Sequence, residues 1–579
     1  MIDVKIKRVK TDVLVIGGGG SGARAAIEAS KYVDSVHLVM KGSFGKTGCT
    51  PIALGGLAVP FGHADNRDNW RVHFMDTLIG GGLLNNQRLV EILCKEAPER
   101  VMELEKWGCA FDRSDSKYYQ RQLGGHSYPR TITSGDKTGR EMMFGLVYQC
   151  EIRKNVHILE DTYITKLFVE NNTICGAVGV ALRTGDVIVF ETPAVILACG
   201  GCGRLWEPYC YSPYGKVGDG LRLAYEAGAE LIDMEFYQYH PTGLIWPPFL
   251  IGRPVSEGVR GEGGRLYNAL GERFMKRYDP SKLELATRDY ISRCIYKEVK
   301  EGRGTPHGGV WLSVTHLPPK IVEDRLPTML EKGLVAGIDI RKEPMEVRYM
   351  NHYQNGGIKI DENGSTKVKG LFAAGEVAGG VHGGNRLGSN SLPDLIVFGK
   401  RAGESAAKYA KELKDISVPD EQLVDELDVI KSPFTNEDGY NPYELKDILT
   451  KTMNEYVDIA RNKEGLERAL EIFGDVSEKF TSLKVSGHSL KFNKDWEVAM
   501  ELRSRVIAGE IIAKTSMFRK ESRAGLFRED FPETDRKNWD CNVAVYRKNG
   551  KMIIEKIPLT VTILEPKEAE LPPFPVPGR

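Results

Sequence analysis

The sequence lacks a long apolar run and an excess of charge of either sign. No stretch of the 579 residues approaches the roughly 20 apolar residues that a membrane helix needs. The first residues, "MIDVKIKRVKTDVLVIGGGG", lack the apolar core of a signal peptide. Lys+Arg and Asp+Glu both number 79, which argues against nucleic acid or an anionic membrane surface as the main partner. We therefore expect a cytoplasmic protein that does not itself span a membrane.

Cysteine is sparse and scattered. The ten cysteines suit a reducing compartment better than a disulfide framework. Cys199 and Cys202, in "LACGGCGR", have CxxC spacing, but the second pair that a four-cysteine metal site needs does not follow. The sequence therefore predicts no metal site.

Glycine, in contrast, is abundant, and its 63 residues cluster in short motifs. In "TDVLVIGGGGSGARAAIEASK" a predicted strand (13–16) and a predicted helix (23–30) flank a loop in which Gly17, Gly19 and Gly22 fit the pattern GxGxxG. Such glycines let the backbone turn sharply and approach a pyrophosphate at the positive N-terminus of the helix. The segment predicts a dinucleotide-binding loop.

A second predicted strand, residues 35–40, is followed by Lys41, where a typical NAD site and many FAD sites carry an acid for the ribose hydroxyls. The absence of this acid disfavours NAD, and FAD would need a different residue to bind its ribose. Two later strands also run into glycines, in "PAVILACGGCGR" and in "KGLFAAGEVAGGVHGGNRLGSNSL", which contains Glu376. A cofactor of FAD's size would explain why such distant segments meet; three unrelated turns are the alternative.

Eight longer segments follow one another along the chain: "DKTGREMMFGLVYQC" (136–150), "MEFYQYHPTGL" (234–244), "SEGVRGEGG" (256–264), "GERFMKRYDP" (271–280), "LATRDYISR" (285–293), "NHYQNGGI" (351–358), "AAGEVAGGVHGGNRLGSNSLPDLIVFG" (373–399) and "RKESRAGLFREDFPETDRKNW" (519–539). In this order they resemble the flavoprotein subunits of succinate dehydrogenase and fumarate reductase, with L-aspartate oxidase as a near relative. The resemblance covers nearly the whole chain.

The resemblance implies an α/β protein: a Rossmann-like FAD-binding domain with an inserted α+β capping domain, a C-terminal helical bundle and a small C-terminal tail domain. The expected limits are 1–237 and 353–412 for the discontinuous FAD-binding domain, 238–352 for the capping domain, 413–525 for the helical domain and 526–579 for the tail.

Two details of the C-terminal half are predicted from pattern alone. In "NPYELKDILTKTMNEYVDIAR", Asn441 is the expected cap of a helix and Pro442 its first residue. One apolar face of this segment is predicted to comprise Leu445, Ile448, Leu449, Tyr456 and Ile459. In "NVAVYRKNGKMIIEKIPLTVTI", Asn549 and Gly550 predict the turn of a hairpin.

The resemblance also implies an FAD-dependent oxidoreductase that interconverts fumarate and succinate as the flavoprotein subunit of an electron-transfer complex. Positions that bind the substrate carboxylates in the family correspond here to His240, Ser256, His352 and Arg386. Arg288, in "TRD", matches the catalytic acid, and Glu257 and Arg260, spaced ExxR, match the relay that returns its proton. Arginine needs such a relay because its pKa lies above ~12. A structural ion-pair cluster is the alternative for this trio.

For the cofactor, the glycine loop and the resemblance together indicate a longer set of residues. They are Gly17, Gly19, Gly22, Lys41, Thr47, Cys49, Gly55, Gly56, Asp219, Glu376, His382, Arg386, Ser389, Ser391 and Leu392. In the family, a histidine bonded covalently to the flavin often occupies the position of Cys49. We therefore expect a non-covalent FAD, with a cysteinyl thioether as the alternative. Losing the covalent bond is expected to lower the flavin potential and to favour fumarate reduction.

Three departures from the family pattern lie near the expected site. The interval between His240 and Ser256 is longer than in the usual dehydrogenases, which predicts a reshaped pocket lid. Gln354 and Asn355 stand where the family commonly has Thr and Met, and Pro393 removes a backbone donor. These departures weaken the assignment of the substrate more than that of the cofactor, so a reductase of another unsaturated acid stays open.

L-aspartate oxidases typically carry a glutamate where "QLGGHSYPR" has Leu123, which cannot pair with a substrate ammonium. The chain has no iron–sulfur or haem motif, so we expect a separate iron–sulfur subunit that can attach the complex to a membrane. A flavin electron-transfer subunit without substrate chemistry is the rival of another class; the many charged residues expected in the site argue against it.

Overall fold

A five-stranded parallel sheet carries the glycine-rich N-terminal loop. The strand order is β20 (Leu371–Ala373), β13 (Ala194–Leu197), β2 (Val13–Ile16), β3 (Val36–Val39) and β9 (Val156–Leu159). All four residues of β2 are buried, as expected for a parallel strand covered on both faces. The structure is a computed structural model that describes residues 2, 4–413, 416–566 and 569.

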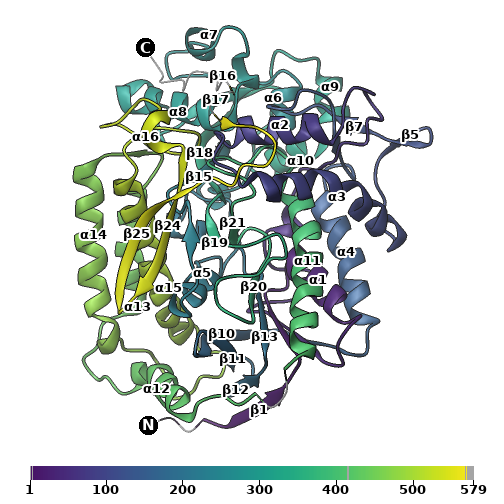
Figure 1. Cartoon of the computed structure of the whole chain (residues 1–579). Coiled ribbons are helices and arrows are strands. Elements are labelled where there is room, and N and C mark those ends of the chain that lie inside the picture. The colour runs from purple at the N-terminus through teal and green to yellow at the C-terminus, as the bar shows by residue number, and fades with distance from the viewer. Residues whose placement is uncertain (1, 3, 414–415, 567–568, 570–579) are drawn as a thin grey trace.

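Two long helices run side by side against this sheet (Figure 1): α1 (Gly20–Ala29) and α11 (Ser391–Lys411). They approach so closely that a Cβ added at Gly403 of α11 would lie 2.3 Å from the carbonyl oxygen of Ala25 in α1. The predicted strand, loop and helix around the GxGxxG pattern are therefore confirmed, and the helix begins directly in the glycine loop.

A second sheet has the order β1 (Ile6–Lys10), β12 (Asp186–Glu191), β11 (Thr173–Ala181) and β10 (Thr162–Glu170). Short helix α5 (Asp219–Glu226) follows it in the chain. Helices α2 (Trp70–Gly80), α3 (Gln87–Lys106) and α4 (Thr138–Glu151) come from the long connection between β3 and β9.

An antiparallel sheet lies at the top of the molecule in Figure 1, in the order β15 (Tyr237–Leu244), β18 (Met345–Gln354), β17 (Val310–Ser313) and β16 (Arg265–Tyr267). Helices α6 (Glu257–Gly261), α8 (Arg288–Glu298), α9 (Pro319–Arg325) and α10 (Pro327–Val335) accompany it. This mixture of strands and helices agrees with the expected α+β insertion, while the domain limits themselves stay a prediction.

Helices α12 (Asp420–Lys431), α13 (Pro442–Tyr456), α14 (Lys463–Glu478) and α15 (Lys494–Phe518) form the C-terminal helical part. The predicted cap is confirmed, because the Asn441 side chain accepts from the backbone N–H of Tyr443 at 2.9 Å. The prediction of the apolar face was wrong at Ile448, which is 42% exposed. Leu445 and Leu449 are buried, and Ile448 falls at the edge of their stripe, one step outside the packed face.

The predicted hairpin is also confirmed. Strands β24 (Cys541–Lys548) and β25 (Lys551–Pro558) are antiparallel, with Lys548 opposite Lys551. Asn549 and Gly550 both have positive φ, 50° and 77°, as a two-residue type I′ turn requires. Strand β24 pairs with β14 (Leu231–Ile232), so the tail is bonded to the strand that precedes the antiparallel insertion. The last part of the predicted tail, 570–579, lies outside the described residues.

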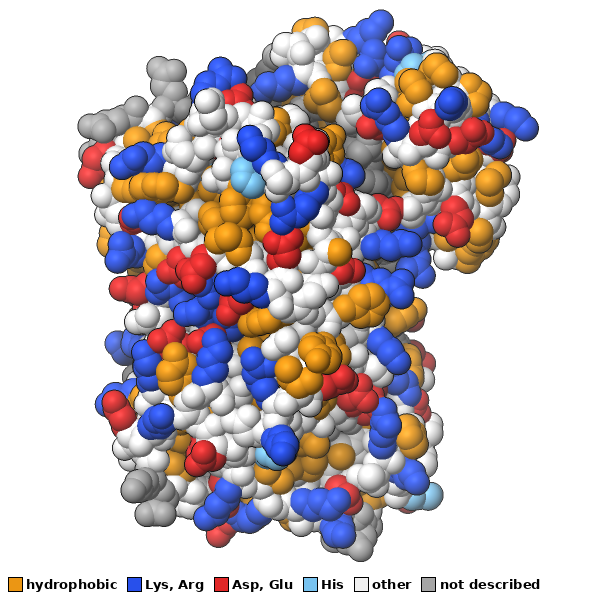
Figure 2. Space-filling view, turned by 90° about the vertical axis from the view of Figure 1, so that its right-hand side faces the viewer, with side chains coloured by type: hydrophobic (Ala, Val, Ile, Leu, Met, Phe, Trp, Pro, Cys, Tyr) orange, Lys and Arg blue, Asp and Glu red, His pale blue; other side chains and the backbone are white. Residues whose placement is uncertain are grey.

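The surface carries no region dominated by charge of one sign on the face in Figure 2, where basic and acidic side chains alternate with apolar ones. Across the described residues, none of the helices combines the length and the apolar character that a membrane span needs.

Candidate active site

A cavity of about 1590 Å³ extends from the glycine loop to the antiparallel sheet. Its walls include most of the residues that the sequence predicted. From the cofactor set these are Gly17, Gly19, Lys41, Thr47, Cys49, Gly55, Gly56, Asp219, Glu376, Arg386, Ser389, Ser391 and Leu392; from the catalytic and substrate sets, His240, Ser256, Glu257, Arg288 and His352. Gly22, Arg260 and His382 are buried beside the cavity without lining it.

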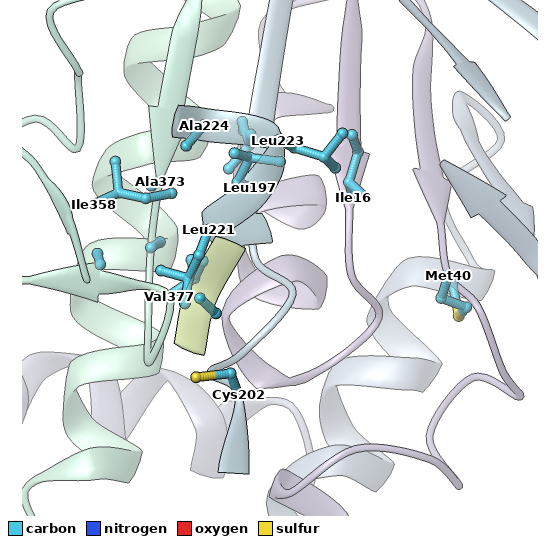
Figure 3. Packing of buried hydrophobic residues seen from close by; sticks show 14 of the residues in the cluster. Ile16, Met40, Leu197, Cys202, Leu221, Leu223, Ala224, Ile358, Ala373 and Val377 are labelled. Atoms are coloured by element: carbon cyan, nitrogen blue, oxygen red, sulfur yellow. The ribbon is translucent and has the colours of Figure 1, made fainter. Parts of the chain in front are cut away.

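The wall near the glycine loop is built at the carboxyl ends of the parallel strands. Figure 3 shows Ile16 of β2 and Leu197 of β13 close to Leu223 of α5. Ile16 and Leu223 also line the cavity. Ligands of open α/β sheets characteristically bind at this edge.

Two glycines of the loop, Gly17 and Gly22, leave no room for a side chain. Gly17 has φ +117°, and a Cβ there would lie 2.3 Å from the carbonyl oxygen of Ala198. A Cβ at Gly22 would lie 1.8 Å from the carbonyl oxygen of Gly17, so this glycine allows α1 to pack on the turn. A Cβ at Gly19 would meet its nearest neighbour, Thr50, at 3.6 Å, which is an ordinary van der Waals contact. This bare backbone at a helix N-terminus fits a dinucleotide pyrophosphate.

We expect Gly22→Ala to abolish FAD binding, because backbone atoms cannot yield to a contact of 1.8 Å. The expected result is protein with less than about a tenth of the wild-type flavin content or no folded protein, measured by absorbance and thermal melting. Gly474→Ala in α14 is the matched control, since a Cβ there meets nothing within 4 Å and alanine favours helix. Full flavin content in the Gly22 variant would contradict the packing argument.

The predicted cofactor residues Lys41 and Asp219 form hydrogen bonds with helix α15 of the C-terminal helical part. The Lys41 ammonium donates to Asp219 at 2.7 Å and to Glu501 of α15 at 2.8 Å. Asp219 also accepts from the hydroxyls of Tyr163 (2.9 Å) and Ser504 (2.6 Å). Opposite charges thus surround Lys41, so helix α15 stabilises this end of the cavity.

Cys49 is a free thiol that lines the cavity. Burial raises its pKa above the ordinary value, which keeps the thiol protonated and weakly nucleophilic. Lys216, which the sequence analysis missed, also lines the cavity and donates to Glu376 at 2.6 Å. This arrangement fits the expectation that Cys49 packs beside a cofactor rather than bonding to it.

The CxxC pair, Cys199 and Cys202, takes part in ordinary packing. Cys199 donates to the carbonyl oxygen of Ile16 at 3.2 Å, and the Cys202 sulfur lies 2.6 Å from the hydroxyl of Tyr237. Within the described ranges, no group of three or more His, Cys, Asp and Glu side chains is arranged to hold a metal ion.

At the other end of the cavity, β15 and β18 bring two histidines together. The rings of His240 and His352 meet edge to face with centroids 5.6 Å apart. Burial and then Arg288 lower the pKa of both imidazoles well below the ordinary value. Both rings are therefore neutral and can donate hydrogen bonds to a carboxylate without adding positive charge.

Ser256 caps helix α6 at the cavity wall. Its hydroxyl oxygen accepts from the backbone N–H of Gly258 at 3.2 Å, so its proton is free to be donated into the cavity. This local capping explains why a serine can hold its hydroxyl at a fixed place in the site.

The three predicted catalytic residues come together as the sequence analysis expected. Arg288, the first residue of α8, donates to one oxygen of Glu257 from Nε (2.9 Å) and Nη2 (2.5 Å). Arg260 lies one turn along α6, with Nη2 3.7 Å from the other oxygen of Glu257. Burial alone would raise the pKa of the Glu257 carboxyl, but Arg288 and Arg260 lower it to about 2. The carboxylate therefore bridges two guanidinium groups.

Gln238 is a site residue that the sequence analysis missed. Its Oε1 accepts from Arg288 Nη1 at 3.1 Å and from Arg386 Nη2 at 2.8 Å, and its Nε2 donates to the carbonyl oxygen of Arg386. Burial and then Arg288 lower the pKa of Arg386 to about 10. The only sequence signal was its place two residues before His240 on β15, which directs both side chains to the same face.

Comparison with known proteins agrees with this geometry. The family described as "FAD binding domain" matches residues 12–392, and "Fumarate reductase flavoprotein C-term" matches 446–571. A fumarate reductase (CoM/CoB) subunit of Methanothermobacter marburgensis is 44% identical over 93% of this chain and 97% of its own length. The succinate dehydrogenase flavoprotein subunit of Rickettsia bellii is 35% identical over 97% of this chain and 98% of its own. The chain belongs to the succinate dehydrogenase/fumarate reductase flavoprotein family.

The likeness extends to solved structures of this family. E. coli quinol fumarate reductase FrdA matches with a TM-score of 0.91 at 32% identity, over 97% of this chain and 98% of that one. The chain is thus an oxidoreductase that uses FAD, and the expected fold class is confirmed.

The departures from the family pattern lie mostly away from the cavity wall. Of the interval 240–256, only His240, Pro254 and Ser256 line the cavity, whereas Trp246 stacks on His307 with ring centroids 4.1 Å apart. The reshaped pocket lid stays a prediction, with three residues of this interval at the cavity wall. Pro393 lies in the first turn of α11, where its missing N–H costs the helix no bond.

The two other departures, Gln354 and Asn355, contact residues that line the cavity. Gln354 accepts from the Tyr237 hydroxyl at 2.7 Å, and its backbone N–H donates to Glu376 at 3.1 Å. Asn355 accepts from the backbone N–H of Arg386 at 3.0 Å. The backbone of Gln354 and the side chain of Asn355 thus each contact a residue that lines the cavity.

Proposed function

We propose that this flavoprotein interconverts fumarate and succinate, with fumarate reduction as the favoured direction. The observation that supports the proposal is the close grouping of polar groups at one end of a cavity that also fits FAD. Here Arg386 and the two neutral histidines can hold carboxylates, and Arg288 can supply a proton. Bound FAD would exchange a hydride with the carbon–carbon bond of the substrate.

The residues of the chain have separate tasks in this proposal. The planar guanidinium of Arg386 binds one carboxylate as a rigid fork, and His240 and His352 donate to the other. Pinning both carboxylates draws charge from the double bond and eases arrival of the hydride. The Arg288 guanidinium then donates a proton to the opposite carbon.

Proton return to Arg288 follows the chain of contacts at α6. Glu257 contacts Arg288 directly and Arg260 at 3.7 Å, so the ionised Glu257 can accept a proton from Arg260 and pass it to the deprotonated Arg288, with Arg260 recovering its proton from solvent. Because Glu257 holds both guanidinium groups, it also fixes the Arg288 side chain toward the cavity.

We also propose that an iron–sulfur protein is the electron-transfer partner. Support comes from the relatives, whose names describe subunits of larger assemblies. The name of the Methanothermobacter relative includes CoM/CoB, so CoM and CoB are electron carriers to be tested. The assembly would be cytoplasmic or associated with a membrane through its partner subunits.

An anaerobic dye-coupled assay with fumarate, succinate and aspartate tests the function. We expect turnover with fumarate and succinate and none with aspartate, because the cavity carries Leu123 where an ammonium would need an acid. Turnover with aspartate would indicate an oxidase of that amino acid. No turnover with any of the three acids would favour an electron-transfer subunit without substrate chemistry.

The non-covalent state of FAD has its own test. On acid precipitation of the purified protein, we expect the yellow colour to stay in the supernatant, because the protonated thiol of Cys49 is a weak nucleophile. Colour that stays in the pellet, and disappears from it in Cys49→Ser, would instead identify a cysteinyl flavin.

A further inference from the structure

The Nδ1 atom of His352 makes no hydrogen bond that would fix the orientation of the imidazole ring. This atom is buried, although the residue lines the cavity. The ring is held instead by two other rings: His240 at its edge, with centroids 5.6 Å apart, and Tyr211 stacked on it, at 5.8 Å and 22°. Because χ2 of histidine has a broad minimum, ring packing decides where its nitrogens point.

Tyr211 is itself fixed at both ends. Its backbone N–H donates to the carbonyl oxygen of Asn351, the residue before His352 on β18, at 2.9 Å. Its hydroxyl donates to the carbonyl oxygen of Ile52 at 2.6 Å. Ile52 ends the short turn that follows Cys49. Tyr211 therefore spans the cavity wall from the Cys49 segment to the strand that carries His352.

We propose that Tyr211 is a positioning residue for dicarboxylate binding, which keeps the His352 ring aligned at the cavity wall. The proposal rests on the proposed function, since it gives His352 the task of binding a substrate carboxylate. The stack supplies a flat apolar support, and the Ile52 bond prevents the phenol ring from turning away. A shift of the Cys49 segment would be transmitted through this bond to His352.

Kinetics of the FAD-loaded enzyme test whether Tyr211 acts through His352. We expect Tyr211→Leu to raise the KM for fumarate about tenfold, the upper range for loss of one aromatic pair, with a smaller change in kcat. Tyr211→Phe keeps the stacked ring but loses the bond to Ile52, so it should recover part of this loss. In a His352→Ala background, Tyr211→Leu should have no further effect. An equal loss in both backgrounds, or no change in KM in either, would overturn the proposal.

A second measurement needs no turnover. Carbethoxylation of His352 by diethyl pyrocarbonate, followed by peptide mass spectrometry, reports how firmly the ring is held. We expect several-fold faster modification in Tyr211→Leu than in the wild type, and an unchanged rate in Tyr148→Leu, a residue on α4 that is 57% exposed. Equal rates in all three proteins would refute the positioning role. If the wild type turns over no dicarboxylate, the proposed function fails and this measurement alone decides the role of Tyr211.

Discussion

Replacing Arg288 by alanine is expected to reduce fumarate turnover by about 10²- to 10⁴-fold, the range for loss of a general acid. The physical reason is the position of its guanidinium, which lines the cavity and is held by Glu257 through two hydrogen bonds. Because Arg386 and the histidines remain, the variant should still bind the dicarboxylate. The measurement is kcat in the anaerobic assay, beside flavin content and succinate binding by flavin absorbance.

Arg325→Ala is the matched control for this variant. Arg325 also lines the cavity, but its side chain is 64% exposed and pairs with Glu262 at 3.0 Å. Exposed pairs of this kind contribute little, so we expect less than about a threefold change in kcat. Undiminished turnover in Arg288→Ala would rule out the acid role. It would favour the alternative that Arg288, Glu257 and Arg260 form a structural ion-pair cluster.

Replacing Gln238 by methionine is expected to lower kcat/KM by about 10²- to 10³-fold. One buried amide oxygen accepts from both Arg288 and Arg386, and methionine removes it while nearly keeping the volume. Leaving buried charged donors without a partner costs a few kcal/mol, and the two guanidinium groups lose their common alignment. Steady-state kinetics with fumarate provide the measurement.

Gln422→Met serves as the control for the methionine substitution. Its side chain donates to the carbonyl oxygen of Val169 at 3.1 Å, on the helical part and outside the cavity wall. We expect wild-type kinetics for this variant. A Gln238→Met enzyme with normal kcat/KM would mean that the two arginines keep their geometry without the shared acceptor.

Several local features of the fold could be predicted because they depend on neighbours in the sequence. The glycine loop before α1, the Asn441 cap and the Asn549–Gly550 turn each follow from backbone rules that act over a few residues. The apolar face of α13 was harder to predict from the sequence. Periodicity located the stripe, but the neighbouring helices decide how wide it is, and Ile448 lies outside it.

The candidate site was predicted only as far as recognisable motifs reached. Arg288, Glu257 and His240 stood in such segments and line the cavity. Gln238 stood in the same segment as His240, yet its partner Arg386 is 148 positions away. Tyr211 bonds to a residue 159 positions away. No local sequence pattern predicts contacts between residues so far apart in the chain.

The sequence by itself determined the family, the cofactor class and the types of residue available for chemistry, because motifs and backbone rules depend on residues within short segments. Only the tertiary structure decided how these residues act. It made the histidines neutral by burial, placed Lys41 between two acids, and joined two arginines through one glutamine. Burial and pairing between distant segments set protonation and orientation, and both arise only when the chain has folded.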